Sequence, residues 1–332
     1  MNIDEISLDV IIPSYRPGVK FLKLVNGLGK QDHPVNKLII MNTDEREMSR
    51  EILDELNRLN EEKSSSLFGK IELHHISKAE FDHAFTRAKG VEYSKAEAFL
   101  CMTDDAVPCD ERLISELLES LYGDEKIAEA YGRQLPLEDT DYAERFTRDF
   151  NYPDTSFIKS ESDIEKYGIK TYFASNVCCM YKRDIYDSLG GFSGPAIFNE
   201  DMVYAAAVIK NGYKIAYCAE ARVLHAHSYT AKQQLKRNFD LGVSQAMHRE
   251  IFDEVPSEGE GIRLVISTMK YLIGIRKYYL IPKLVIQSGS KFIGYRLGKA
   301  YERLPDWMIM KLAMNTSFAK SRLLKSREDK KL

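Results

Sequence analysis

The residues that decide the fold are 98–108, with the sequence AFLCMTDDAVP. Five apolar residues come first, and Thr103, Asp104 and Asp105 follow them directly. A short apolar run that stops at polar residues is typical of a buried β-strand. In open α/β sheets, ligands bind beyond the carboxyl ends of the strands. The pattern therefore places two adjacent carboxylates on a tight turn at a ligand-binding rim.

Three apolar runs upstream of this stretch are also predicted to be strands, at 8–13, 37–42 and 70–76. Segments of helical spacing or helix-favouring composition separate them, at 21–28, 45–62 and 80–94. This alternation predicts an α/β fold with a doubly wound, mostly parallel sheet flanked by helices. Three loops are then expected to share one rim, those at 13–18, 42–45 and 103–108.

The second half of the chain has a weaker pattern. Over 130–180 we expect irregular loops that line a substrate cleft, with a β-favouring run at 172–181. Helices are predicted at 183–189 and 201–211, and a strand at 213–224 ends just before His225 and His227. The rest is expected to be mainly helical.

The charge of the 332 residues is unevenly distributed. Residues 262–332 carry 16 Lys and Arg against 4 Asp and Glu, a balance of +12 that leaves −15 for residues 1–261. We expect a main domain over 1–250, with two halves of about 1–110 and 111–250. A basic helical extension, 251–332, then either docks on its own acidic body or binds an anionic partner.

The sequence also indicates a compartment. The N-terminus is acidic where a signal peptide would be basic, and no apolar run reaches the roughly 18 residues that a membrane span needs. Five cysteines show no metal-ligand spacing, and an odd number makes a disulfide framework unfavourable. We therefore expect a cytoplasmic protein with reduced cysteines.

The carboxylates suggest chemistry, although each has an ordinary explanation. Asp104 and Asp105 suit Mg²⁺ or Mn²⁺, which take their other ligands from substrate phosphates and water, but acidic turns are also common without a metal. Glu200 and Asp201 open a predicted helix, where carboxylates act as caps. A carboxylate there could also be the general base that takes a proton from an attacking hydroxyl group.

His225 and His227 are candidate ligands of the same cation. We expect them to point to opposite sides of the chain, so that at most one faces the cleft easily. Lone histidines are more often structural.

In combination, these segments resemble family 2 glycosyltransferases of the GT-A fold, and more narrowly their bacterial rhamnosyltransferase branch. The resemblance covers about residues 8–250. It is carried by VIIPSYRP (10–17), FDHAFTRAKG (81–90), FLCMTDDAVP (99–108), YGRQLP (131–136), YFASNVCCMYKRDIYDSLGGF (172–192), FNEDM (198–202), GYKIAYCAEARVLHAHSYT (212–230) and KRNFDLGVSQ (236–245).

The resemblance implies that residues 1–250 are the catalytic domain, with a nucleotide half at about 1–110 and an acceptor half at about 111–250. It also implies a role for each matching residue. Asp201 would be the catalytic base, and Asp105 would bind the metal with His225 or His227. Asn176 and Glu200 would contact the acceptor. Nucleotide and donor contacts would come from Pro13, Ser14, Tyr15, Arg16, Asn42, Arg87 and Asp104. Two positions depart from the family pattern, because Asn42 stands where Asp is usual and Ala88 where Asn is usual.

The implied reaction is an inverting transfer of L-rhamnose from dTDP-rhamnose to a hydroxyl group of a growing cell-surface glycan. A UDP-hexose or UDP-N-acetylhexosamine donor is an alternative, and so is a non-catalytic scaffold that binds nucleotide sugars. A nucleotidyltransferase would need a glycine-rich basic loop after the first strand, and residues 14–18 are a poor one. No nucleic-acid partner is expected.

The basic extension has two interpretations. Between 262 and 297 apolar groups alternate with Lys and Arg, as in helices that lie on an anionic membrane surface. The alternative is a helix pair that packs on the catalytic domain or forms a homodimer with a second subunit. The acceptor would be a glycan, and a lipid-linked one would make attachment at the inner face of the cell membrane useful.

Overall fold

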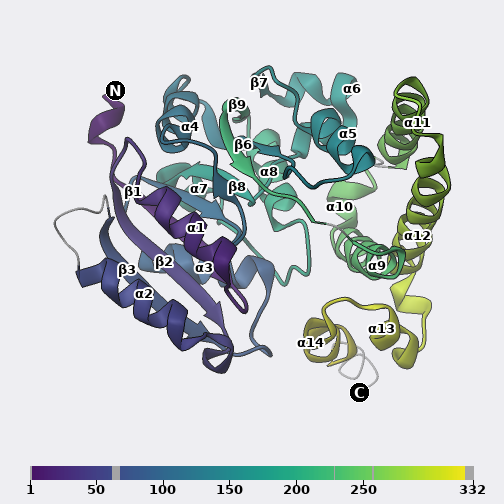
Figure 1. Cartoon of the computed structure of the whole chain (residues 1–332), viewed down its shortest axis with the longest axis horizontal. Coiled ribbons are helices and arrows are strands. Elements are labelled where there is room, and N and C mark those ends of the chain that lie inside the picture. The colour runs from purple at the N-terminus through teal and green to yellow at the C-terminus, as the bar shows by residue number, and fades with distance from the viewer. Residues whose placement is uncertain (1, 62–67, 228, 256–257, 326–332) are drawn as a thin grey trace.

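The computed structural model describes residues 2–61, 68–227, 229–255 and 258–325, and a nine-stranded sheet forms its centre (Figure 1). The strands run in the order β3-β2-β1-β4-β8-β6-β9-β5, and β7 pairs with β9. Their bounds are β1 Leu8–Ser14, β2 Val35–Thr43, β3 Phe68–Ile76, β4 Ala98–Met102, β5 Val107–Pro108, β6 Ile127–Leu135, β7 Phe157–Lys159, β8 Cys178–Lys182 and β9 Lys214–Leu224.

The first four long strands are parallel, as the alternating pattern predicts. β1 lies between β2 and β4, and β2 also pairs with β3. Because parallel strands need crossover connections, a helix follows each of the first three. These helices are α1 Val19–Leu28, α2 Arg50–Glu61 and α3 His83–Tyr93, and α4 Leu113–Tyr122 follows β5.

The second half of the sheet is mixed. β8 is antiparallel to both β4 and β6, whereas β6 and β9 are parallel.

The expectation of loops over 130–180 is wrong in part, because this region contains the end of β6, the helix α5 Tyr142–Asn151 and the short strand β7. α5 begins at an Asp141 side chain that caps the Glu144 amide. Its mixed aromatic and charged residues form the two faces of an amphipathic helix.

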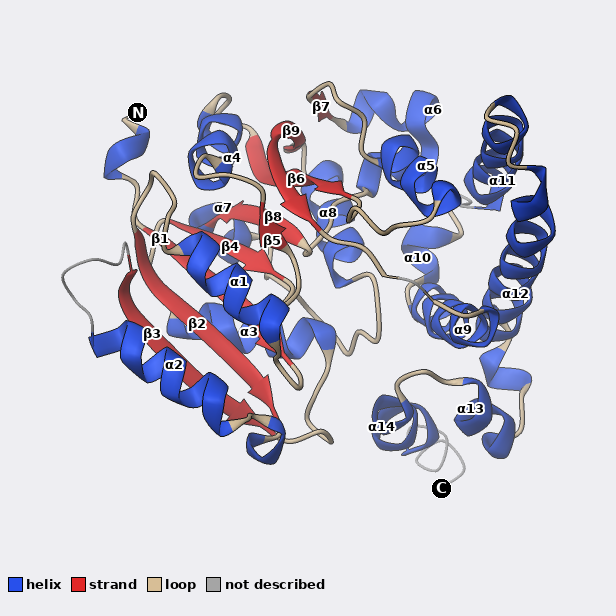
Figure 2. Cartoon of the chain, viewed as in Figure 1, coloured by secondary structure: helices blue, strands red, loops and turns tan. Residues whose placement is uncertain are grey.

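Helices cover both faces of the sheet, so the doubly wound arrangement is confirmed (Figure 2). Residues of α1, α2 and α4 share one apolar cluster with Leu8, Val10 and Ile12 of β1. The other face of β1, represented by Ile11, packs with α3, α7 Arg183–Ser188 and α8 Glu200–Lys210. The alternation of β1 residues between the two clusters follows from the two-residue period of a strand.

The chain ends in helices beside the sheet. They are α9 Ala231–Met247, α10 Arg249–Phe252, α11 Glu258–Gly274, α12 Ile281–Lys299, α13 Asp306–Leu312 and α14 Thr316–Phe318. The backbones of α9 and α12 are in direct contact at two glycines of α12. A Cβ atom on Gly294 would lie 2.1 Å from the carbonyl oxygen of Leu235, and one on Gly298 would lie 2.1 Å from that of Phe239. A domain boundary at residue 250 stays a prediction. Residues 326–332 of the expected extension lie outside the described residues.

Within the described part of the chain, no helix combines the length and the apolar character that a membrane span requires.

Candidate active site

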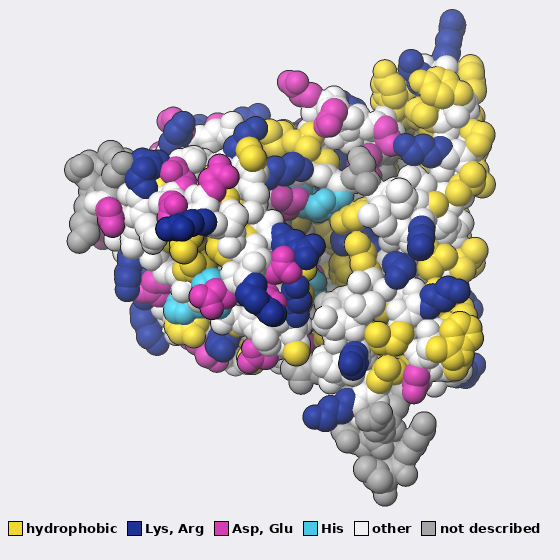
Figure 3. Space-filling view, turned by 60° about the horizontal axis from the view of Figure 1, so that its bottom comes forward, with side chains coloured by type: hydrophobic (Ala, Val, Ile, Leu, Met, Phe, Trp, Pro, Cys, Tyr) yellow, Lys and Arg dark blue, Asp and Glu magenta, His cyan; other side chains and the backbone are white. Residues whose placement is uncertain are grey.

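A cleft of about 1170 Å³ lies at the carboxyl ends of β1 and β4 and extends to the C-terminal helices. Residues 15–21, Thr43 and residues 103–105 line it together, so the prediction that three loops share one rim is confirmed. Figure 3 shows a hollow in the middle of the view, where His, Lys and Arg side chains gather. Most of the predicted site residues line this cleft, namely Tyr15, Arg16, Arg87, Asp104, Asp105, Asn176, Glu200, Asp201, His225 and His227.

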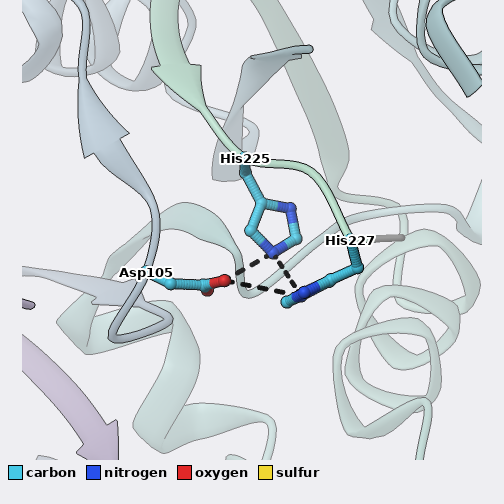
Figure 4. Close-up of side chains that lie close together, drawn as sticks. All are labelled: Asp105, His225 and His227. Carbon is cyan, nitrogen blue, oxygen red and sulfur yellow. Dashed lines mark hydrogen bonds and ion pairs between the residues drawn. The ribbon is translucent and has the colours of Figure 1, made fainter. Parts of the chain in front are cut away.

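Asp105, His225 and His227 form a compact cluster in the cleft (Figure 4). One ligand atom from each residue lies within 4.8 Å of the other two. The Nε2 atom of His225 lies 3.4 Å from Asp105 Oδ1, and that of His227 lies 3.5 Å from Asp105 Oδ2. A carboxylate and two imidazoles are suitable ligands for a divalent cation.

The expectation that the two histidines point to opposite sides is wrong. Residues two positions apart lie on the same side of an extended chain. β9 ends at Leu224, and in the segment beyond it both rings turn toward Asp105 (Figure 4). The two Nε2 atoms are 3.0 Å apart. Both histidines therefore face the cleft.

The protonation of the cluster suits metal binding. Burial lowers the pKa of His225, and it lowers that of His227 to about 4, so both rings are neutral near pH 7. Burial raises the pKa of Asp105, but at low pH, where the histidines are protonated, the hydrogen bond and charge of His225 and the charge of His227 outweigh burial and bring this pKa to about 2. The cluster is thus ready to bind a cation without first losing protons.

Gln134 at the end of β6 orients His225. Its Oε1 atom lies 3.0 Å from Nδ1 of His225 and accepts a hydrogen bond when that nitrogen is protonated. This tautomer leaves Nε2 as the lone-pair donor that a metal requires. Gln134 is itself held, because its Nε2 atom donates to Tyr152 Oη at 2.5 Å and to Ser175 Oγ at 3.0 Å.

Asp104 differs from its neighbour. Its Oδ2 atom accepts a hydrogen bond of 3.2 Å from the Tyr15 backbone amide, which ties the β4 turn to the β1 loop. Burial, with the Asp105 charge adding to it, raises the pKa of Asp104 to about 6. The pKa of Asp104 is thus above the ordinary value of an aspartate, whereas that of Asp105 is below it.

Asp201 and Glu200 begin α8 and have different surroundings. Asp201 accepts hydrogen bonds from the backbone amides of Asn176, at 3.0 Å, and Met202, at 2.9 Å. Burial and the Glu200 charge raise the pKa of Asp201 to about 7. A general base is most effective when its pKa lies near the pH at which the enzyme works.

Glu200 is buried and paired. Its Oε1 atom lies 2.9 Å from Nη1 of Arg87 and accepts a hydrogen bond of 3.1 Å from Asn176 Nδ2. Burial opposes ionisation, but the charge of Arg87 lowers the pKa of Glu200 below its ordinary value. Asn176 is also fixed, because its Oδ1 atom accepts from Tyr181 Oη at 2.8 Å. The expected roles of Arg87 in donor binding and of Asn176 and Glu200 in acceptor binding stay predictions.

The loop 13–16, which was predicted to bind the nucleoside, lies only partly at the cleft. Arg16 forms an ion pair of 2.6 Å with Glu47, and its guanidinium group lies 5.1 Å from the centre of the Tyr15 ring. Pro13, Ser14 and Asn42 are not among the residues that line the cleft. Asn42 is fully buried, accepts from Ser14 Oγ at 3.3 Å and donates to the Asp44 carbonyl group at 3.1 Å. Its contact with a base stays a prediction.

Three further residues at the cleft received no individual role in the sequence analysis. Gln134 stands in the YGRQLP segment at the end of a strand, a position that could have marked it. Arg237 on α9 and Lys291 on α12 also line the cleft. Arg237 belongs to the KRNFDLGVSQ segment and Lys291 to the basic extension, but no local pattern brings the two together, because their meeting depends on how α9 and α12 pack.

Comparison with known proteins agrees with this geometry. A sequence model of the family described as glycosyl transferase family 2 matches residues 9–190. An O-antigen chain rhamnosyltransferase of Salmonella anatum is 36% identical over 302 residues, which are 90% of this chain and 91% of that protein. Another O-antigen chain rhamnosyltransferase, from Salmonella typhimurium, is 35% identical over 300 residues, with the same coverage of both chains.

The fold has a counterpart among solved structures. A mannosyltransferase from Pyrobaculum calidifontis, in complex with GDP-Man and Mn²⁺, matches with a TM-score of 0.51 and 13% identity over 98% of this chain and 88% of that one. This likeness confirms the predicted GT-A fold. The family match and the two relatives together show that the chain belongs to glycosyltransferase family 2.

Proposed function

We propose that this glycosyltransferase moves L-rhamnose from dTDP-L-rhamnose to a hydroxyl group of a cell-surface glycan. The observation that carries the transfer is the common cleft, in which the Asp105, His225 and His227 cluster and the raised-pKa carboxylate of Asp201 both lie. The choice of sugar is supported by the two rhamnosyltransferase relatives, which align over 90% of the chain.

In the proposed mechanism, Asp201 takes the proton of the acceptor hydroxyl group as its oxygen attacks the anomeric carbon. The bond from that carbon to the diphosphate breaks in the same step, so the configuration inverts. Asp201 is suited to this role because its two backbone donors fix the carboxylate and its pKa of about 7 leaves much of it ionised at neutral pH. Glu200, held by Arg87, supplies the negative charge that helps keep this pKa high.

The residues present fit a divalent cation. Ligand-atom separations between 3.0 and 3.5 Å, together with the fixed tautomer of His225, suit a cation with bonds of about 2.1 Å. Such an ion would stabilise charge on the departing diphosphate. Two imidazole nitrogens favour Mn²⁺ over Mg²⁺, which prefers oxygen ligands. We therefore propose Mn²⁺ as the better cofactor.

The donor is tested with a panel of nucleotide sugars. Each donor is incubated with the protein and Mn²⁺, and release of the nucleoside diphosphate is measured with and without glycan acceptors. dTDP-L-rhamnose should give the fastest release. Preference for a UDP-hexose or UDP-N-acetylhexosamine would contradict the proposed sugar, and no release from any donor would favour the scaffold alternative.

We further propose that the enzyme works at an anionic membrane surface on the cytoplasmic side, where it would meet a lipid-linked acceptor. Residues 261–301 contain no Asp or Glu and eight Lys or Arg. Large apolar side chains are exposed over the same helices, and Figure 3 shows them with basic residues along the right-hand edge. They include Ile262, Ile266 and Ile273 of α11, Tyr278 and Tyr279 of the connection, and Val285, Ile286, Phe292 and Ile293 of α12. Apolar residues with surrounding cations are typical of surfaces that bind anionic lipids.

Flotation with phosphatidylglycerol and phosphatidylcholine vesicles tests this surface. The protein should float with the anionic vesicles at low salt, and the double variant Phe292→Asp, Ile293→Asp should not. Ile158→Asp is the matched control, because Ile158 is also half-exposed but lies on β7. If the unchanged protein stays at the bottom and light scattering finds a dimer that the double variant loses, the surface is a subunit interface instead.

A further inference from the structure

Two cations from the C-terminal helices project into the cleft without a counter-ion. Arg237 and Lys291 line it, and the side chain of neither makes a hydrogen bond or ion pair with any residue that the structure describes. The other two arginines deep in the cleft have carboxylate partners. Arg87 pairs with Glu200 at 2.9 Å, and Arg148 pairs with Glu144 at 3.2 Å.

Arg237 is held by aromatic rings rather than by charge. Its guanidinium carbon lies 4.5 Å from the centre of the Phe198 ring and 5.5 Å from that of Tyr229. Stacking of this kind orients the planar group and leaves its N–H donors free. The nearby carboxylate of Asp240 accepts from the backbone amides of Met314 and Asn315 instead, at 2.9 to 3.2 Å.

The side chain of Lys291 is partly buried. Burial lowers its pKa, with the positive charges of Arg237 and Arg148 acting in the same direction and the negative charges of Glu144 and Asp141 opposing them. A partly buried ammonium group with no partner costs free energy, so its position is best explained by a ligand that neutralises it. The neighbouring residues on α12, Phe292 and Ile293, are 58% and 52% exposed on the outer side. Lys291 thus stands on the cleft side of the helix whose opposite side carries the apolar surface.

The chemistry of the two groups points to phosphate. Arginine binds phosphate through parallel N–H donors, and lysine adds a point charge. In the proposed function, the metal cluster binds the diphosphate of the donor. We propose that Arg237 and Lys291 form a second anion subsite, which binds a phosphate group of the acceptor. This inference rests on the proposed transfer to a lipid-linked glycan, whose lipid would leave the cleft along α12.

The test measures binding, so that it does not depend on which sugar is transferred. Hexyl phosphate serves as the probe and is titrated into the full-length protein saturated with Mn²⁺ and dTDP, which occupy the donor side. Lys291→Met and Arg237→Gln should each weaken probe binding about tenfold or more, the loss expected for one charged hydrogen bond. Hexyl glucoside, a neutral molecule with the same chain, should bind equally to all forms.

Lys299→Met is the matched control, because Lys299 lies on the same helix but pairs with Asp253 at 2.8 Å and does not line the cleft. It should bind the probe like the unchanged protein. A second titration, with dTDP and Mn²⁺ alone, identifies the source of the phosphate. If the Lys291 and Arg237 variants lose dTDP affinity and keep hexyl phosphate affinity, these residues serve the donor and the proposal is overturned. Equal binding of hexyl phosphate to all variants would overturn it as well.

Discussion

The two walls of the cleft differ in how their charges are balanced. On the sheet wall, several charged groups pair with one another: Asp105 with His225 and His227, and Glu200 with Arg87. On the helical wall, Arg237 and Lys291 have no described counter-ion. Paired groups hold each other in position before substrate arrives, whereas unpaired cations gain their partner from the ligand. We therefore expect changes on the sheet wall to reduce turnover and changes on the helical wall to weaken binding.

The largest effect is expected from the metal cluster. Asp105→Ala, or thorough chelation, should lower sugar transfer about a thousandfold, or roughly 4 kcal/mol of barrier, because the departing diphosphate loses its main stabilising charge. Initial rates with added Mn²⁺ or Mg²⁺ measure this, and Mn²⁺ should restore the chelated enzyme better. Asp253→Asn, outside the cleft, is the control. Transfer that survives chelation would remove the metal from the mechanism.

The next effect concerns the base. Asp201→Asn removes the proton acceptor and keeps the shape of the side chain, so kcat should fall at least about a hundredfold, or roughly 2.7 kcal/mol, with dTDP binding retained. Single-turnover rates together with a dTDP titration separate the two quantities. Near-normal turnover would exclude Asp201 from this role, and lost dTDP binding would mean that the sheet wall had been disturbed.

The smallest effect is a shift of the pH profile. Asp201 acts when ionised and has a pKa of about 7, so kcat/KM should decline as the pH falls through that value. Glu200→Gln removes a negative charge that raises this pKa and leaves the Arg87 charge uncompensated. The acid limb should therefore move to lower pH. If the acid limb of the Glu200→Gln profile does not move, a group other than Asp201 titrates at that pH.

Local pattern predicted the nucleotide half well and the acceptor half in part. In the acceptor half, the strand at 213–224 and the helices at 183–189 and 201–211 are observed almost as expected. Strands near 8–13, 37–42, 70–76 and 98–102 are observed almost as expected, because buried parallel strands have continuous apolar runs and short connections. The region 130–180 was predicted as loops but contains α5, whose amphipathic pattern is short and mixed with aromatic residues. The side on which His227 lies was also predicted wrongly, because residues two positions apart in an extended chain point to the same side and not to opposite sides.

The sequence by itself determined the four parallel strands of the first half, the rim with its two adjacent carboxylates and the acidic start of α8. These features depend on residues close together in the chain, whose apolar period and polar breaks fix the local backbone. Only the tertiary structure decided that Asp105 meets both histidines and that Arg237 and Lys291 face the same space. The first meeting depends on the pairing of β5 with the end of β9. The second depends on the close contact of α9 and α12 at Gly294 and Gly298. Both are contacts between segments that lie far apart in the sequence.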